Sequence, residues 1–410
     1  MENAPSHPPS SIRYPRRILI RGVNWLGDAV MTTPALLRLR EKFPDSHITL
    51  LTPEKLNDLW ADHPAVNETI PFAPDESVFA ISRKLRRWGE RRREPLHESK
   101  TEPATAREYA RPTQSDLALV LPNSPRSAME TWLARVPQRT GYARPWRNWF
   151  LTQAIPPRAG TVKMRKRTVA EIQRLVAADV SRRTIPENRA FTSAATSVHQ
   201  IHEYLHLAAS LGVNPEPLAP ELFVSPQEVE AVKKKFSLEQ IMEPIFGLNP
   251  GAEYGPAKRW PVECFIAAAR EIQKRTNCVW LIFGGEGDSP IANPIESGIQ
   301  NSKFKIQNLV GRTRLRELMA LLKSCRVLMT NDSGPMHVAA ALGTPVVVPF
   351  GSTSPELTGP GLPGDTRHRL LKSDVPCSPC FLRECPIDFR CMTGITVERV
   401  VEAVLDASNG

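Results

Sequence analysis

The amino-acid sequence predicts an α/β protein made of two doubly wound parallel sheets. In both halves of the chain, short apolar runs typical of buried strands alternate with amphipathic segments of helical period. Glycine or small polar residues directly follow several of the apolar runs, as at the carboxyl ends of parallel strands. A proline-rich stretch, 213–220, separates the halves and is predicted to be an inter-domain linker.

In the N-terminal half the first strand enters a glycine-bounded turn, 22–28, and an amphipathic helix follows. We expect Thr33 to cap this helix, with Pro34 in its first turn, and Phe43-Pro44 to end it. The predicted elements of this half are strands at 17–21, 47–51 and 117–121 and a helix at 201–211 that ends at Gly212.

In the C-terminal half the alternation of strand and helix is regular, which is the pattern of a parallel sheet covered by helices. The predicted helices are 227–236, 261–275, 315–324, 336–342 and 398–406, and the predicted strands are 244–248, 278–283, 327–330 and 346–350.

The length, apolar content and net charge of the chain limit the kinds of protein that it can be. The 410 residues suffice for two or three domains of about 150 residues. No run of about 18 apolar residues predicts a membrane span, and the polar segment 1–16 resembles a disordered tail rather than a signal peptide. We therefore expect a cytoplasmic protein. The net charge of +10 indicates an anionic partner, which nucleic acid, an acidic membrane face or a phosphorylated substrate would all satisfy.

Segment 82–114 differs from its surroundings because it is rich in arginine at first and then polar without an apolar period. It is predicted to be the end of a basic helix followed by a flexible loop. A solvated surface insertion is the first interpretation, and contact with an anionic membrane surface is the second.

The strongest candidate for a chemical site is the segment 329–337. A buried strand ends there, small and polar residues follow, and a helix begins near Pro335. The free amides around Ser333 and Gly334 and the positive pole of that helix form an anion site. His337 lies one turn further, on the side that Ser333 faces. The alternative is ordinary helix capping by Asp332 or Ser333.

A second candidate, 249–261, also leaves a strand and enters a helix. Its Lys258 and Arg259 are suited to neutralising a diphosphate, although such a pair is often only solvated surface charge. The glycines and prolines around the pair favour a shaped loop.

Two carboxylates, Asp28 and Glu286, follow glycines in the turns after predicted strands. Asp28 lies at the mouth of the first strand–helix turn, where it is either a general base or a helix cap. Glu286 follows two glycines after the strand at 278–283, where it could accept hydrogen bonds from ribose hydroxyls. The first turn lacks the Lys-Ser/Thr of a P-loop and the chain has no Gly-x-Gly-x-x-Gly in this turn, which disfavours nucleotide hydrolases and dinucleotide oxidoreductases.

Four of the seven cysteines are close together in the segment 376–392. The spacing of these four cysteines, Cys377, Cys380, Cys385 and Cys391, is typical of metal ligands. Four thiolates predict a structural zinc site, and an Fe–S cluster is the less favoured metal interpretation. The alternative is a reduced or locally oxidised loop.

These motifs together resemble glycosyltransferase family 9. The resemblance extends from about residue 17 to 403 and is carried by Gly27-Asp28 with Thr33-Pro34-Ala35-Leu36, by the twelve-residue loop 250–261, and by segments 122–124, 139–142, 284–286 and 331–341. It implies a GT-B fold, in which two Rossmann-like domains face a cleft. Domain 17–215 would hold the acceptor and domain 216–410 would hold ADP-heptose.

The resemblance further implies an inverting transfer of L-glycero-D-manno-heptose to the first heptose of the lipopolysaccharide inner core, without a catalytic cofactor. The acceptor would be heptosyl-Kdo2-lipid A, and the enzyme would be peripheral on the inner face of the inner membrane. By position, Asp28 would be the general base and Glu286 would bind donor hydroxyls. The other implied donor-site residues are Lys258, Asp332, Ser333, Gly334 and His337, and the implied acceptor-side residues are Asn24, Trp25, Asn123 and Ser124.

Two alternatives remain open at this point. The loop 250–261 resembles family members that add the second heptose, but transfer of the first heptose or transfer to another acceptor is the first alternative. The distant alternative is a nucleic-acid-binding protein, for which the arginine- and tryptophan-containing stretch 144–150 is the candidate surface. We expect no nucleic-acid partner.

Overall fold

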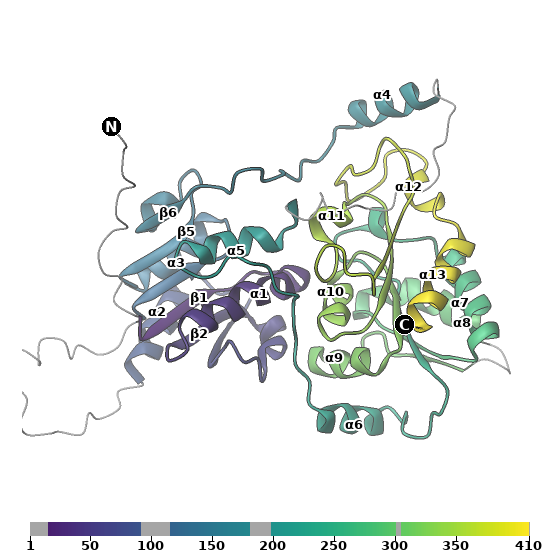
Figure 1. Ribbon diagram of the computed structural model, residues 1–410, viewed down its shortest axis with the longest axis horizontal. Coiled ribbons are helices and arrows are strands. Elements are labelled where there is room, and N and C mark those ends of the chain that lie inside the picture. The colour runs from purple at the N-terminus through teal and green to yellow at the C-terminus, as the bar shows by residue number, and fades with distance from the viewer. Residues whose placement is uncertain (1–14, 92–114, 181–197, 301–304, 410) are drawn as a thin grey trace, which may run out of the picture.

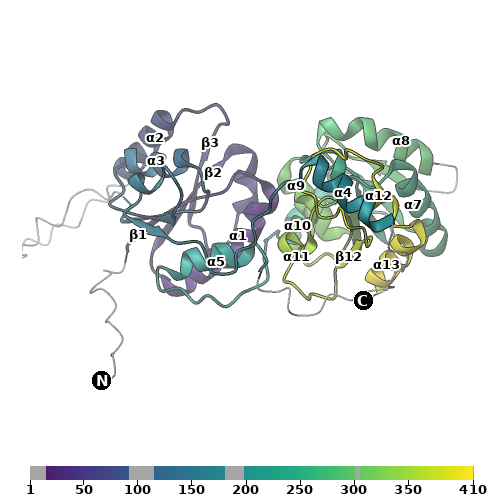
Figure 2. The same ribbon diagram turned by 90° about the horizontal axis from the view of Figure 1, so that it is seen from above.

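The structure is a computed structural model that describes residues 15–91, 115–180, 198–300 and 305–409. Most of the predicted tail and residues 92–114 of the basic segment lie outside the described residues. Two lobes stand side by side, and each is built around one parallel sheet (Figures 1 and 2). In the described part of the chain, no helix combines the length and apolar character that a membrane span requires.

The N-terminal lobe has six parallel strands in the spatial order β3-β2-β1-β4-β5-β6. The strands are β1 (Arg17–Arg21), β2 (His47–Pro53), β3 (Glu68–Phe72), β4 (Leu117–Val120), β5 (Gln138–Tyr142) and β6 (Gln153–Ile155). Helices α1 (Leu26–Lys42) and α5 (Ile201–Ala209) pack together on one face, and α2 (Val78–Arg91) and α3 (Pro125–Leu133) on the other (Figure 2). The chain reverses its winding direction between β1 and β4.

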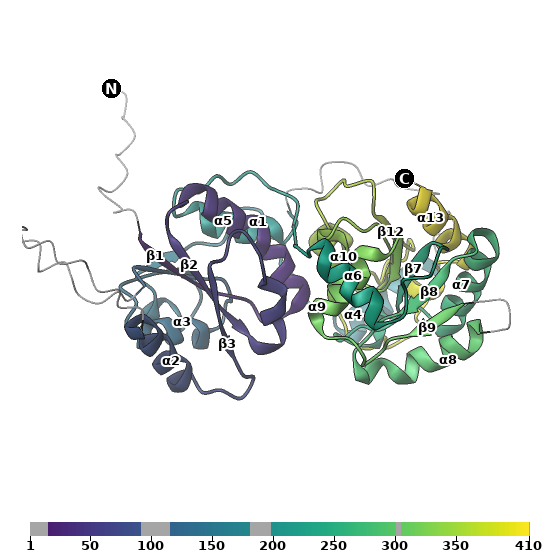
Figure 3. The same ribbon diagram turned by 90° about the horizontal axis from the view of Figure 1, so that it is seen from below.

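The C-terminal lobe repeats this topology, with the spatial order β12-β11-β10-β7-β8-β9. Figure 3 labels β12, β7, β8 and β9 of this sheet. Its strands are β7 (Ile245–Asn249), β8 (Val279–Ile282), β9 (Ile306–Asn308), β10 (Val327–Thr330), β11 (Val346–Phe350) and β12 (Arg369–Lys372). Its helices are α6 (Pro226–Lys235), α7 (Val262–Thr276), α8 (Ser289–Ile299), α9 (Leu315–Ser324), α10 (Gly334–Ala341), α11 (Pro355–Thr358), α12 (Arg390–Thr393) and α13 (Val397–Asn409). The winding reverses between β7 and β10, so both sheets are doubly wound as predicted.

The start of α1 differs from the expectation. The helix begins at Leu26, and Pro34 lies inside it rather than in a first turn capped by Thr33. A proline inside a helix leaves the carbonyl four residues earlier without its donor. Here the Thr33 hydroxyl donates to that carbonyl, the oxygen of Val30, at 2.8 Å. The helix therefore continues through Pro34, and Asp28 belongs to its first turn.

Two segments connect the lobes. The first is the predicted linker, 213–220. Directly after it, the Glu221 amide donates to Thr33 Oγ1 on α1 and the Leu222 amide donates to the Ala341 carbonyl on α10. Helix α4 (Val169–Val180) follows the N-terminal sheet in sequence but lies against the C-terminal lobe (Figures 1 and 2). Its Ile172 packs on the cysteine-rich segment 376–392.

A buried ion pair joins the carboxyl end of β1 to helix α3 in the N-terminal lobe. Arg21 at the end of β1 and Glu130 on α3 are joined by a 2.7 Å contact between Nε and Oε2, and both side chains are almost wholly buried. The Arg21 guanidinium also donates to Asn24 Oδ1 at 3.2 Å. Arg126, which is half exposed, contacts the second oxygen of Glu130. The pair therefore anchors the loop after β1 to α3.

We predict that Glu130→Gln lowers the free energy of unfolding by about 3–5 kcal/mol, because it leaves the Arg21 charge buried without a partner. Arg126→Ala removes an exposed contact to the same carboxylate and should cost no more than about 1 kcal/mol. Urea unfolding of both variants measures the difference. Equal losses for the two variants would contradict the prediction.

Candidate functional site

The predicted site residues gather where each doubly wound sheet reverses direction, which is where such sheets bind ligands. In the C-terminal lobe, β7 and β10 are neighbours, and Asn249 lies opposite Thr330 at their carboxyl ends. The loop that carries Lys258 and the turn that carries Ser333 therefore start side by side. The topology itself brings the two predicted donor-site segments together.

Two asparagines bind these segments to each other. Asn249 Nδ2 donates to Thr330 Oγ1 and to Ser333 Oγ, both at 3.1 Å. Asn331 Nδ2 donates to the Pro250 carbonyl at 2.7 Å, and Asn331 Oδ1 accepts from the Trp260 amide at 2.9 Å. Neither side chain has a role in the predicted site. The signal that was available is an asparagine at the ends of two strands that become neighbours only in the folded sheet.

Lys258 is held in place by Asp332. Its Nζ lies 2.7 Å from Asp332 Oδ2, and the Thr353 hydroxyl donates to the same oxygen at 2.5 Å. Both charged side chains are largely buried. Ser333 occupies the N-cap position of α10 but makes no side-chain capping bond. Ser333 therefore does not cap α10 through its side chain, and Asp332, which pairs with Lys258 and Thr353, does not occupy the cap position.

The N-terminal lobe reaches this site through Gly27. A Cβ atom at Gly27 would lie 2.7 Å from His337 Cδ2, and one at Gly334 would lie 2.9 Å from Leu26 Cβ. The first turns of α1 and α10 are therefore in direct contact, and a side chain at either glycine would separate them. Asp28 directly follows Gly27, and Lys258 of the other lobe lies near enough to act on its charge.

The pKa values of Asp28 and His337 are both shifted from their ordinary values, in opposite directions. Burial raises the pKa of Asp28 to about 6, while the nearby positive charge of Lys258 acts in the opposite direction. Burial lowers the pKa of His337 to about 4, although Asp332 opposes that shift. At pH 7 Asp28 is therefore ionised and His337 is neutral. The cap position of α1 belongs to Trp25, so Asp28 is not its N-cap.

The predicted acceptor-side residues lie at the corresponding edge of the N-terminal sheet. Asn24 and Trp25 follow β1, Asn123 and Ser124 follow β4, and these two strands are neighbours. Asn123 Oδ1 accepts from the buried Arg147 at 3.3 Å. Ser124 Oγ accepts from the Ser127 amide, so this hydroxyl caps α3. Trp25 is half exposed, and Lys55 Nζ lies 5.5 Å from the centre of its ring.

Glu286, the remaining predicted donor-site residue, follows a different strand from Lys258 and Ser333. It is exposed on a 3-10 turn, Glu286–Asp288, that follows β8. The carboxylate next to the loop after β7 belongs to Asp288, which lies 2.4 Å from the position of a Cβ at Gly251. Asp288 Oδ2 also accepts from the Gly285 amide at 3.0 Å.

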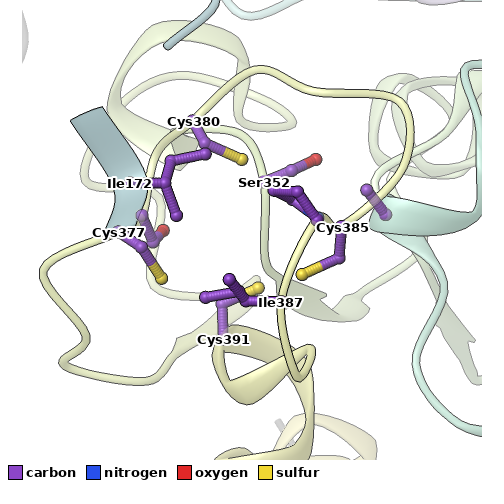
Figure 4. Close-up of a pocket in the computed structure, with 10 residues that line it drawn as sticks. Ile172, Ser352, Cys377, Cys380, Cys385, Ile387 and Cys391 are labelled. Atoms are coloured by element: carbon purple, nitrogen blue, oxygen red, sulfur yellow. The ribbon is translucent and has the colours of Figure 1, made fainter. Parts of the chain in front are cut away.

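The cysteine-rich segment does not support the predicted zinc site. The four thiols lie around a small cavity that they share with Ile172 and Ile387 (Figure 4). Among the described residues, no group of three or more His, Cys, Asp or Glu side chains is arranged to hold a metal ion. Burial raises the pKa of Cys391 to about 12 and also raises the pKa of Cys377 and Cys380. The predicted zinc site therefore has no support in the arrangement of these side chains.

Comparisons with known proteins agree with the fold and the motifs. The family model of glycosyltransferase family 9 (heptosyltransferase) matches residues 168–389 of this chain. Lipopolysaccharide heptosyltransferase 2 of Salmonella typhimurium is 30% identical over 352 residues, which are 84% of this chain and 85% of that protein. Lipooligosaccharide heptosyltransferase 2 of Haemophilus influenzae is 30% identical over 363 residues, which are 87% of this chain and 90% of that protein.

A solved structure gives the same result. The structure of E. coli ADP-heptose lipopolysaccharide heptosyltransferase II superimposes with a TM-score of 0.69 at 26% identity, and the match covers 96% of this chain and 98% of that chain. The expected GT-B fold of two Rossmann-like lobes is thereby confirmed. By sequence, by topology and by the motifs at both sheet edges, the chain belongs to glycosyltransferase family 9.

Proposed function

We propose that this chain is a heptosyltransferase that moves L-glycero-D-manno-heptose from ADP-heptose to the first heptose of the lipopolysaccharide inner core, with inversion. The observation that carries the proposal is the contact of Gly27 with His337, because it brings a carboxylate of one lobe to a phosphate-binding turn of the other. The names of the similar proteins support heptose as the transferred sugar.

In this mechanism Asp28 is the general base. Inversion requires a single displacement, in which an acceptor oxygen attacks the anomeric carbon while the bond from that carbon to ADP breaks. Asp28 takes the proton of the acceptor hydroxyl. Its pKa of about 6 suits this role, because the carboxylate is ionised at neutral pH and is still basic enough to accept the proton.

The leaving ADP is stabilised from the opposite lobe. Lys258 and the amides of Ser333 and Gly334 at the start of α10 supply fixed positive charge to the diphosphate. His337, which is neutral, donates a further hydrogen bond. Asp332 orients Lys258. Positive charge fixed in this way supports departure of the diphosphate without a catalytic metal.

The two lobes divide the substrates between them. Residues 17–215 would provide the acceptor site, with Asn24, Trp25, Asn123 and Ser124 lining the edge next to Asp28. Residues 216–410 would bind ADP-heptose, with Glu286 accepting hydrogen bonds from ribose or sugar hydroxyls. Both substrates would then meet at the turn that carries Asp28.

Because the acceptor is a lipid, we propose that the enzyme works in the cytoplasm, peripherally on the inner face of the inner membrane. Trp146 and Trp149 are 82% and 86% exposed in the loop after β5, at the sheet edge that carries the acceptor-side residues. Arg147 between them is buried and holds the loop to Asn123. Exposed tryptophans are typical of membrane interfaces. The exposed arginines of α2, Arg83, Arg86 and Arg87, supply positive charge on the same lobe.

The transferase proposal is tested by ADP release from ADP-heptose with a mono-heptosylated Kdo-lipid A acceptor. Release should require the acceptor, and Asp28→Asn should lower turnover at least ~10²-fold because the base is lost. Asp45→Asn, an exposed carboxylate after α1, serves as the matched control and should keep full activity.

Other outcomes would point to the alternatives. Preference for the acceptor that lacks heptose would assign transfer of the first heptose. Retention on heparin with no turnover would favour the nucleic-acid alternative. Equal turnover of Asp28→Asn and wild type would remove Asp28 from the mechanism.

The pH dependence tests the environment of Asp28 independently. The base works only when it is ionised, so turnover should be full above the raised pKa and should fall as the pH drops through about 6. The residual activity of Asp28→Asn should lack this acidic limb. A pH profile of kcat/KM, which reports groups of the free enzyme, measures both, and a limb near pH 4 in the wild type would show that Asp28 is not desolvated.

The membrane proposal predicts that the double variant Trp146→Ala/Trp149→Ala binds vesicles containing anionic lipid at least ~10-fold more weakly, because two interfacial side chains are lost. Met242→Ala removes a side chain that is 92% exposed on the other lobe and should bind as the wild type does. Vesicle sedimentation measures binding. Unchanged sedimentation of the double variant would contradict the proposal.

A further inference from the structure

The cysteine-rich segment 376–392 contacts the loop that presents Lys258. The Arg383 carbonyl accepts from the Ala257 amide at 2.9 Å, and the Phe381 carbonyl accepts from the Tyr254 hydroxyl at 2.8 Å. Gly255, at φ +151°, lies so close that a Cβ atom would be 2.6 Å from the Arg383 carbonyl oxygen. The loop that presents Lys258 is therefore formed against this segment.

The segment is itself tied to the end of β11. The amides of Cys380 and Phe381 both donate to the Ser352 carbonyl, at 3.1 and 2.7 Å, and the Ser378 hydroxyl donates to the Gly351 carbonyl at 2.7 Å. Thr353, the next residue along that strand end, holds Asp332. The residues around Arg383 are thus anchored to the same strand end that orients the partner of Lys258.

The side chains of Lys258 and Arg383 both lie over the aromatic ring of Tyr254. Lys258 Nζ lies 4.9 Å from the centre of the Tyr254 ring, and Arg383 Cζ lies 5.4 Å from it. Both positive groups are attracted by the ring electrons, so Tyr254 holds them near each other. Lys258 is paired with Asp332. For Arg383, which is exposed, no carboxylate partner is found within the described residues.

We propose that Arg383 is a second cation for the diphosphate of the donor and that Tyr254 is its positioning residue. The inference rests on the proposed function and adds to it a binding residue from the cysteine-rich segment. An arginine fork binds two phosphate oxygens at once, whereas Lys258 acts as a point charge. Together they neutralise more of the charge that develops on ADP as it leaves, and Arg383 remains open to solvent until the nucleotide binds.

The test is calorimetric titration of the full chain with ADP and, by competition, with adenosine. Arg383→Ala should weaken ADP binding by about tenfold, the loss of one charged hydrogen-bonding group, and should leave adenosine binding within twofold. Glu384→Ala changes the neighbouring exposed side chain and serves as the control. Tyr254→Phe keeps the ring and should retain ADP affinity, whereas Tyr254→Leu should lose it as Arg383→Ala does.

Three other outcomes would each overturn the inference. Equal ADP affinities for Arg383→Ala and Glu384→Ala would show that Arg383 is only surface charge. Equal losses for ADP and adenosine would show that Arg383 shapes the loop instead of binding phosphate. Both results overturn the inference while leaving the transferase proposal intact. Failure of the wild type to bind ADP at all would overturn the proposed function, and this inference with it.

Discussion

The contact between the first turns of α1 and α10 is the constraint on which the rest of the site depends. Each helix begins at the carboxyl edge of its own sheet, so each directs its positive pole and its unpaired amides toward the other lobe. Gly27 and Gly334 allow these turns to approach within van der Waals distance of His337 and Leu26. The proposed general base and the proposed phosphate-binding turn, which belong to different sheets, thereby come to lie at one site.

The pairing of charges within that site follows from the same geometry. Lys258 is held by Asp332, its neighbour in the C-terminal lobe, and does not form an ion pair with Asp28. Direct pairing with a lysine would favour the ionised form of Asp28 and lower its pKa. Because burial dominates instead, the pKa of Asp28 rises to about 6, and the carboxylate keeps the basicity that proton transfer requires. The pairing of Lys258 with Asp332 is thus compatible with the proposed role of Asp28 as the base.

Much of the fold could be predicted because the patterns are local. The strands 17–21, 327–330 and 346–350 and the helix 315–324 have the predicted bounds, since an apolar run or a helical period ends at a turn residue in each. The start of α1 could not be predicted, because a threonine hydroxyl replaces the donor that Pro34 lacks. The spacing of the four cysteines suggested a metal, but spacing does not show that their thiols face an apolar cavity and lack a ligand arrangement. Helix α4 packs away from its neighbours in sequence, and no local pattern predicts this.

Local sequence patterns were sufficient to predict the class of fold, the two sheet edges where ligands would bind, and the residue types at those edges, because each of these depends on residues that are close together in the chain. Which groups act on each other depends on the tertiary structure. Asn249 reaches Ser333, Lys258 reaches Asp332 and Tyr254 reaches Arg383 across long separations in the chain. The order of strands in the sheet and the docking of α1 on α10 set these contacts, and both arise from the burial of apolar faces over the whole molecule rather than from any short segment.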